Sequence, residues 1–395
     1  MTETSSPEYP PHYLESNWKA QWSLPDRIVY LNHGSFGPSP NTVRHSHENW
    51  SRQLEQQPCD FLLRRLPAHL DHALSRLADF LETSPDNLTF SDNATTAMNA
   101  VAQSTSLQPG DEVLLTDHEY GAVQRIWEHT CKRAGAKLTI ATLPYPMTSV
   151  NKVVRCISES ITERTRMLVV SHITSPTAVI LPVEPIVELA RKRHVSVCID
   201  GPHAPGMIPL QLDSLNCDYY TASCHKWLSA PFGSGFLFVH PRVQNTVQPA
   251  IISWGRPTEN EPPKWQDEFQ WGGTKDFASW LSIPSAIDFL KSSDLMRFRD
   301  YTHDLARYFR THLEDYFEST SFIPDSNEWY GSMVAMPLPS GPYKHLQKTL
   351  WDKYQTEIPI IEWKNHTLIR ISCHLYNDYK DIDHLLNALS ELFPR

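Results

Sequence analysis

Lys226 is the residue of this chain best suited to covalent chemistry. It follows the strand-like run Tyr219–Ala222 and the stretch Ser223-Cys224-His225, and the apolar pair Trp227-Leu228 comes directly after it. A lysine in such surroundings loses hydration, which lowers its pKa because burial disfavours the charged form. A neutral amine attacks carbonyl groups, so Lys226 is a candidate for forming a Schiff base; a structural lysine that caps a turn is the alternative.

Asp200 stands 26 residues before Lys226, at the end of the strand-like run Val195–Ile199. Ligands of parallel sheets bind at the carboxyl ends of the strands. A carboxylate at one strand end and a lysine after the next suggest a pyridoxal 5′-phosphate (PLP) site, where the carboxylate pairs with the pyridinium nitrogen. An aspartate in front of glycine is also a common turn former, which is the alternative.

Two places offer donors for the phosphate of such a cofactor. Asn93–Asn99 follows a strand and opens a helix, and a helix start with the hydroxyls of Thr95 and Thr96 suits a phosphate. Ser223 and His225, beside the lysine, are donors suited to the same group. An ordinary helix cap or a hydrogen-bonded turn is the alternative in each place.

Tyr120, His203 and Arg370 complete the set of groups that PLP chemistry requires. Tyr120 lies just past a strand end and could stack on the ring, and His203 could contact the phenolic oxygen. Arg370 lies in a β-branched run, where a guanidinium is costly unless it meets a carboxylate, and its planar fork suits a substrate α-carboxylate. A core tyrosine, a hydrogen-bonded histidine and a structural ion pair are the alternatives.

Strands and helices alternate from residue 87 to residue 239. The pattern predicts strands over 87–90, 112–115, 137–143, 166–171, 195–200, 218–222 and 235–239, and helices over 94–104, 119–134, 151–161 and 184–193. Such alternation predicts βαβ units and a mostly parallel sheet.

The flanking regions predict further elements. Helices are expected over 14–22, 41–56, 59–82 (interrupted by Pro67), 276–291, 296–319 and 378–392, strands over 332–337, 357–362 and 368–372, and an irregular segment over 254–275. We therefore predict an N-terminal arm (1–26) that packs with the small domain, a large PLP-binding domain (27–285) and a small C-terminal α+β domain (286–395).

Composition narrows the classes of function. The 395 residues carry a net charge of −10, which argues against a nucleic-acid or anionic-membrane surface. No 18-residue apolar run exists, and the polar, acidic N-terminus lacks the features of a signal peptide. Seven scattered cysteines predict reduced thiols in the cytoplasm, and the 19 histidines show no spacing typical of a metal site.

Four segments add a resemblance to a known family. They are Tyr30–Gly37, Phe61–Leu66, Asp200–Gly206 and Trp271–Thr274. Together with the residues above, these segments resemble the class V aminotransferase family of fold-type I PLP enzymes. Within that family they resemble the isopenicillin N epimerase-like branch, which includes cysteine or cystine C–S lyases and ergothioneine-pathway sulfoxide lyases. The resemblance implies an α/β fold: a large domain with a mostly parallel seven-stranded sheet flanked by helices, and a smaller α+β C-terminal domain joined by the N-terminal arm.

The resemblance also implies roles at the cofactor ring. Lys226 forms the internal aldimine, and Asp200 pairs with the pyridinium. His203 and Ser175 lie near the phenolic oxygen, and Tyr120 occupies the stacking position.

The implied phosphate contacts come from two subunits. Thr95, Thr96, Ser223 and His225 hold the phosphate within the subunit. Thr274 reaches the phosphate of a neighbouring subunit, which implies a homodimer with shared active sites.

The implied substrate contacts are Arg370 at the carboxylate and, on the arm, Asn32 and His33. Arg64 and Arg65 could hold a distal carboxylate, or could be solvated or interface arginines. A persulfide-forming desulfurase is disfavoured because no cysteine occurs between Cys224 and Cys373.

The expected reaction begins with removal of the Cα proton of an α-amino acid by Lys226. Epimerisation and C–S β-elimination are the two expected outcomes, and Tyr120 or His33 could donate a proton from the far face. A class V aminotransferase proper, a non-catalytic PLP-fold protein and a metal-dependent hydrolase remain as alternatives.

Overall fold

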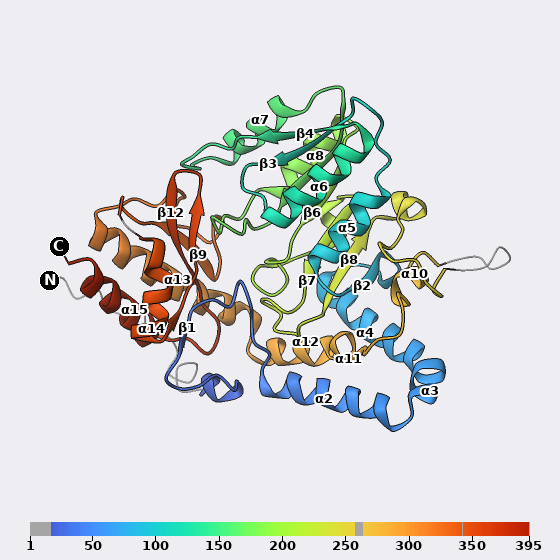
Figure 1. Cartoon of the computed structure of the whole chain (residues 1–395), viewed down its shortest axis with the longest axis horizontal. Coiled ribbons are helices and arrows are strands. Elements are labelled where there is room, and N and C mark those ends of the chain that lie inside the picture. The colour runs from blue at the N-terminus through green and yellow to red at the C-terminus, as the bar shows by residue number, and fades with distance from the viewer. Residues whose placement is uncertain (1–16, 257–263, 342, 395) are drawn as a thin grey trace.

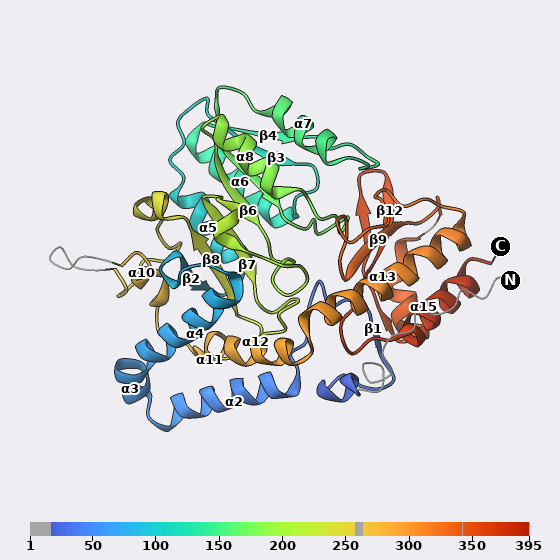
Figure 2. The same ribbon diagram turned by 180° about the vertical axis from the view of Figure 1, so that it is seen from behind.

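The computed structural model describes residues 17–256, 264–341 and 343–394 of the chain (Figure 1). A large body that carries the central sheet lies beside a smaller body, and the view from behind shows the same arrangement (Figure 2). The helix predicted over 14–22 falls partly outside the described residues. Within them, η1 (Trp18–Gln21) is a 3₁₀ turn.

The large body is built on a seven-stranded sheet. In sheet order its strands are β2 (Leu88–Ser91), β8 (Gly235–Val239), β7 (Tyr219–Ser223), β6 (Ser196–Asp200), β5 (Thr165–Ser171), β3 (Glu112–Thr116) and β4 (Lys137–Ala141). The pairs that involve β8 are antiparallel and the other pairs are parallel. Strands β3, β5, β6 and β7 therefore end at one edge of the sheet.

Helices cover both faces of this sheet. The inner strands are therefore buried on both sides, and their sequences are continuous apolar runs. The covering helices are α5 (Ala94–Ser104), α6 (Gly121–Ala134), α7 (Val150–Ser160) and α8 (Val183–Lys192). Helices α5 and α6 pack together over a core that includes Met98, Leu115 and Trp127. Helices α7 and α8 pack together over the opposite face, whose core continues into the small body.

The small body carries a three-stranded antiparallel sheet in the order β11–β12–β9. Its elements are α13 (Leu295–Phe317), β9 (Met333–Pro337), α14 (Leu346–Tyr354), β11 (Ile360–Trp363), β12 (His366–Ser372) and α15 (Tyr379–Leu392). Helix α13 packs on β9 and on α15. This pattern is the α+β arrangement expected for the C-terminal part.

The N-terminal arm joins the small body through backbone pairing. Strand β1 (Val29–Tyr30) pairs in parallel with β10 (Thr356–Glu357), and Asn32 forms a bridge with Ser372. The pairing thus extends past residue 26, where we predicted the arm to end. The boundaries 27–285 and 286–395 stay predictions.

Further helices lie below the large sheet in Figure 1: α2 (Asn41–Gln56), α3 (Pro58–Asp60), α4 (Leu66–Leu81), α11 (Ala278–Leu281) and α12 (Ile283–Ser292). The short helices α9 (Leu212–Leu215) and α10 (Asp267–Gln270) complete the large body. The predicted helix over 59–82 is divided by the π-helical turn η2 (Phe61–Arg65). Pro67 does not interrupt α4, because it lies in the first turn, where its missing N–H is not needed.

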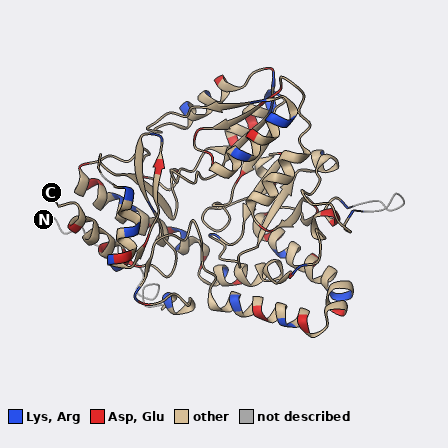
Figure 3. Ribbon diagram, in the orientation of Figure 1, with Lys and Arg blue, Asp and Glu red and all other residues tan. Residues whose placement is uncertain are grey.

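The fold class predicted from the sequence is confirmed: a mostly parallel sheet of seven strands lies between helices, with a smaller α+β body beside it. Charged side chains lie mainly on the outer helices, and the central sheet carries few (Figure 3). Among the described helices, none combines the length and apolar character that crossing a bilayer requires.

Candidate active site

The candidate active site is a cavity of about 540 Å³ at the carboxyl edge of the large sheet. This volume is within the range of about 300–1,000 Å³ that is usual for small-molecule sites. The walls come from the large sheet, from the loop after β1 and from β12 of the small body. The predicted residues that line the cavity are Thr95, Thr96, Tyr120, Ser175, Asp200, His203, Ser223, His225, Lys226 and Arg370.

Lys226 follows the end of β7, and its amine faces His203. The Lys226 Nζ lies 3.0 Å from the His203 Nε2. Burial lowers the pKa of Lys226, the charge of Arg370 lowers it further, and the charge of Asp200 opposes this. Together these surroundings favour a neutral amine, as a nucleophile or base requires.

Asp200 ends β6 and is buried in the floor of the cavity. Its Oδ1 accepts a hydrogen bond of 3.0 Å from the Thr221 hydroxyl. Burial raises the pKa of Asp200, and the Thr221 hydrogen bond and the charge of Lys226 oppose that rise. A protonated ring nitrogen beside Asp200 would stabilise its carboxylate in the same way.

The start of α5 forms one corner of the cavity. The Asn93 side chain caps the helix by accepting from the Thr96 N–H at 2.9 Å, and the Ser223 hydroxyl accepts from the Ala94 N–H at 3.0 Å. A Cβ on Gly235 would lie 2.5 Å from the Ala222 carbonyl oxygen and 2.9 Å from the Asn93 Cα. Only glycine lets β8 approach this corner so closely.

Arg370 reaches the cavity from β12 and is only 3% exposed. One terminal nitrogen donates to the backbone oxygen of Ser175 and to its hydroxyl, and the other donates to the Ser35 hydroxyl at 2.7 Å. No carboxylate of the described residues lies within ion-pairing distance of this guanidinium. Burial lowers the pKa of Arg370 to about 10, because within the described ranges no anion offsets the loss of hydration.

Two buried atoms of the cavity residues have no hydrogen-bond partner within the described ranges. They are the His225 Nδ1 and the Arg370 Nε. Buried polar atoms nearly always have partners, so these two atoms suit a ligand that brings oxygen acceptors. A phosphate beside His225 and a carboxylate beside Arg370 would satisfy both atoms, and PLP with an amino acid carries these groups.

Tyr120 lies at the rim of the cavity. Its side chain is 49% exposed, and the residue is the N-cap of α6. The neighbouring Glu119 fixes this turn, because its carboxylate accepts from the Thr116 hydroxyl, from the Ser171 N–H and from the Ser171 hydroxyl. Burial raises the pKa of Glu119 to about 7.

Three predicted site residues lie outside this cavity. Asn32 is buried, with its amide 3.4 Å from Glu357, and Thr274 is exposed on the irregular segment. His33 is fully buried behind Lys226, whose backbone oxygen lies 3.0 Å from the His33 Nε2.

His33 is instead part of a buried cluster that joins the arm to the small body. Its Nδ1 lies 2.9 Å from the Tyr376 hydroxyl, and its ring stacks on that of His374 at 4.0 Å. Burial lowers the pKa of His33 to about 3, which keeps the ring neutral. The arm residues that do line the cavity are Gly34, Ser35 and Phe36.

Arg64 and Arg65 also lie away from the cavity lining. Both pair with Asp60, at 3.2 Å and 3.1 Å. Of the two readings of these arginines, this geometry fits solvated or interface residues. Cys373 is buried at the end of β12 and does not line the cavity, as expected for a packed thiol.

Four residues at or beneath the cavity were missed by sequence reasoning: Ser35, Ser171, Glu119 and Trp227. The segment Tyr30–Gly37 signalled that the arm contributes to the site, but not which of its side chains faces inward. Glu119, adjacent to Tyr120 at a strand end, is the one that a search for buried carboxylates could have found.

Known proteins match this chain over nearly its full length. The family model described as aminotransferase class-V matches residues 62–385. An isopenicillin N epimerase of Amycolatopsis lactamdurans is 35% identical over 391 residues, covering 95% of this chain and 98% of the relative. A putative L-cysteine desulfhydrase of Oryza sativa subsp. japonica is 26% identical and covers 92% of this chain and 83% of the relative.

Solved structures match the fold. A cystine C–S lyase in complex with its reaction product, cysteine persulfide, superposes with a TM-score of 0.79 at 21% identity, over 93% of this chain and 98% of that one. A mutant of that lyase with glycine covalently linked to its PLP cofactor gives a TM-score of 0.78 at 21% identity, over 93% and 100% of the two chains. The matched family model, the epimerase relative and the cavity agree: the chain belongs to the class V aminotransferase family of PLP-dependent enzymes.

Proposed function

We propose that this enzyme removes the Cα proton of an α-amino acid and that epimerisation at Cα is its reaction. The observation that carries this proposal is the Arg370 guanidinium. It is buried in the same cavity as the Lys226 amine and has no carboxylate partner in the part of the chain that the structure describes. A cation that fits a carboxylate, beside a base that fits a Cα proton, selects an α-amino acid as substrate.

The side chains at the cavity have distinct tasks. When bound, PLP supplies a carbonyl that condenses with amines and a ring that withdraws electrons from Cα. We assign the ring nitrogen to Asp200, the phenolic oxygen to His203 and Ser175, and the stacking face to Tyr120. Lys226 holds the Cα proton at its Nζ after removing it.

The phosphate has its own group of donors. We assign it to Thr95 and Thr96 at the start of α5, to the Ser223 hydroxyl and to His225. A phosphate beside His225 would raise the pKa of this side chain, because an anion stabilises the imidazolium. Burial lowers that pKa to about 4 in the free chain.

Epimerisation requires a second proton donor on the face opposite Lys226. Tyr120 is the cavity residue suited to this task, since it carries a hydroxyl at the open rim. His33 is unsuited, because it lies on the Lys226 side of the wall and is bound to the backbone there. The 35% identity to an isopenicillin N epimerase supports this choice.

C–S β-elimination is the second candidate. It requires the same base and carboxylate clamp but no second donor, because the leaving group departs from Cβ. The similarity to L-cysteine desulfhydrases, at 25–27% identity, supports it. Substrates for this outcome are amino acids that carry sulfur on Cβ.

We further propose a homodimer in which Thr274 of one subunit approaches the phosphate site of the other. The support is the position of Thr274, which is exposed and outside its own cavity. Gly272 and Lys275, which lie near it in the chain, share a pocket with Ile251, and Ile251, Ile252 and Trp254 are exposed apolar side chains. An exposed apolar patch of this kind usually marks an interface. We also assign the enzyme to the cytoplasm, where seven thiols without a disulfide remain reduced.

Proton NMR in deuterated water distinguishes the candidates. The PLP-loaded enzyme is mixed with L-amino acids, including cystine and S-substituted cysteines. Loss of the Cα–H signal with formation of the D-isomer supports epimerisation, and appearance of pyruvate with a released thiol supports β-elimination. Transfer of the amino group to an added 2-oxo acid would make the enzyme an aminotransferase, and an unchanged Cα–H signal with every amino acid would refute the proposal.

A further inference from the structure

Three side chains form a hydrogen-bonded row that leads from the core into the cavity wall: Trp227, His203 and Lys226. The Trp227 Nε1–H donates to the His203 Nδ1 at 3.2 Å, and the Lys226 Nζ lies 3.0 Å from the His203 Nε2. Trp227 and His203 are both buried, so the hydrogen bond between them is shielded from water.

The chemistry of the indole decides the direction of both hydrogen bonds. An indole N–H can only donate, so the His203 Nδ1 must present its lone pair to Trp227. A neutral imidazole carries one proton, which must then reside on Nε2 and point at Lys226. Burial and the charge of Arg370 lower the pKa of His203, which keeps the ring neutral.

The same reasoning applies to Lys226. An ammonium group has three donors and no acceptor, so it would place an N–H against the N–H of His203. A neutral amine has a lone pair and accepts that hydrogen bond. Among the charged neighbours, Arg370 also opposes the ammonium, and only Asp200 favours it.

We infer that Trp227 is a positioning residue that fixes His203 as the Nε2–H tautomer and thereby holds Lys226 as a neutral amine. With PLP bound, the same tautomer would let His203 donate a hydrogen bond to the phenolic oxygen that we assign to it. The consequence for catalysis rests on the proposed role of Lys226, whereas the tautomer can be measured without cofactor or substrate.

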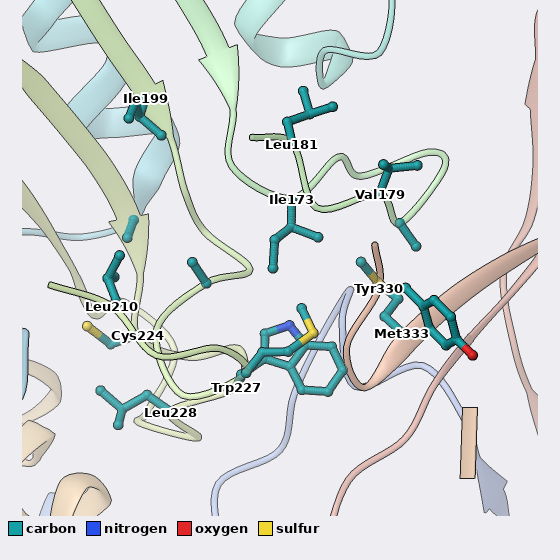
Figure 4. Packing of buried hydrophobic residues seen from close by; sticks show 14 of the residues in the cluster. Ile173, Val179, Leu181, Ile199, Leu210, Cys224, Trp227, Leu228, Tyr330 and Met333 are labelled. Atoms are coloured by element: carbon teal, nitrogen blue, oxygen red, sulfur yellow. The ribbon is translucent and has the colours of Figure 1, made fainter. Parts of the chain in front are cut away.

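The packing around Trp227 prevents the indole from turning away. Figure 4 shows Trp227 where the large body meets Met333 of the small body, with Leu228 and Ile173 nearby. The His33 ring lies 5.4 Å from the indole. The N–H is therefore held toward His203 by the core itself.

The first test is nitrogen NMR of the cofactor-free, full-length chain with ¹⁵N-labelled histidine. The His203 signals are identified by their loss in His203→Asn. We expect wild-type His203 to show the Nε2–H tautomer, and a wild-type Nδ1–H tautomer would overturn the inference. This measurement needs no tryptophan variant to fold.

The second test compares Trp227→Phe with Trp127→Phe. Trp127 is also fully buried and its N–H is also bound, to the Met98 sulfur at 3.3 Å, but it lies in the other core. Lys226 of the cofactor-free chain is titrated by the pH dependence of its carbamylation by cyanate, read by mass spectrometry.

In Trp227→Phe, His203 can accept from an ammonium group, so the midpoint of this titration should rise by about one pH unit, the value of one hydrogen bond. Trp127→Phe should leave the midpoint unchanged. Equal midpoints in the two variants would refute the role of Trp227. Because neither measurement uses a substrate, failure of the proposed reaction would leave both results intact.

Discussion

Replacing Arg370 tests the proposed substrate contact most directly. Of the five N–H groups of its guanidinium, three are used by Ser175 and Ser35. The remaining two are the Nε–H and one N–H of the nitrogen that binds Ser35, and these match the two oxygens of a carboxylate. Each hydrogen bond to a charged group contributes about 1.5–3 kcal/mol.

Arg370→Gln removes both contacts, and we expect a loss of about 3–6 kcal/mol in transition-state binding. This corresponds to a decrease of about 10²–10⁴-fold in kcat/KM. Arg370→Lys keeps the charge but loses the fork, and we expect a decrease of about 10–100-fold.

The assay is exchange of the Cα proton in deuterated water, measured for an amino acid and for its primary amide. The kcat/KM of wild type should be about 10²–10⁴-fold higher for the acid than for the amide. Arg370→Gln should exchange the Cα protons of the two compounds at almost equal rates. An unchanged preference for the acid in Arg370→Gln would show that another group binds the carboxylate. The charge of Arg370 also lowers the pKa of Lys226, so the Lys226 titration should move to higher pH in the Gln variant.

Three further perturbations follow from the structure. The pKa of Glu119 is about 7 in the folded state against an ordinary value of 4.5, so the folded state binds this proton more tightly than the unfolded state. The free energy of unfolding should therefore fall as the pH rises between these two values, by up to about 3 kcal/mol. Glu119→Gln should flatten this part of the stability profile in urea unfolding, and an unchanged slope would contradict the buried acid. Gly235→Ala places a methyl group 2.5 Å from the Ala222 oxygen and should lower stability by about 1–3 kcal/mol in thermal unfolding. The control is Gly272→Ala, whose added Cβ would meet no atom of the described residues within 4 Å, and it should leave stability unchanged. Trp254 is 92% exposed, and Trp254→Asp should convert the proposed dimer to monomer in sedimentation experiments. The control is Met296→Asp on α13, at a side chain that is 68% exposed, and it should leave the dimer intact. A Trp254 variant that stays dimeric would place the interface elsewhere.

Local patterns were sufficient to predict most of the fold. The helix over 94–104 and the strand over 235–239 agree with the structure residue for residue, because apolar periodicity and clear turn residues delimit both. The predicted strand over 357–362 is in fact two, β10 and β11, which pair with different partners. A continuous polar-apolar pattern does not reveal a change of partner.

The cavity was predictable where residues follow a strand end. Lys226, Asp200 and Tyr120 line its wall because the carboxyl ends of the strands meet at one edge, and their roles there stay predictions. On the arm, neighbouring residues point in opposite directions in a loop without periodicity. His33 therefore lies behind the wall and Ser35 within it, and only tertiary structure distinguishes the two.

The pairing of β1 with β10 has a consequence for biosynthesis. Residues 29–30 have their strand partner at residues 356–357, and His33 meets Tyr376 still later in the chain, so the arm is translated well before its partners. While translation continues, the backbone around Lys226 therefore lacks the support that the arm and the C-terminal body give it together. The arm and the C-terminal body can support this backbone together only after residues 356–376 have been synthesised, so the wall behind Lys226 is completed late in translation.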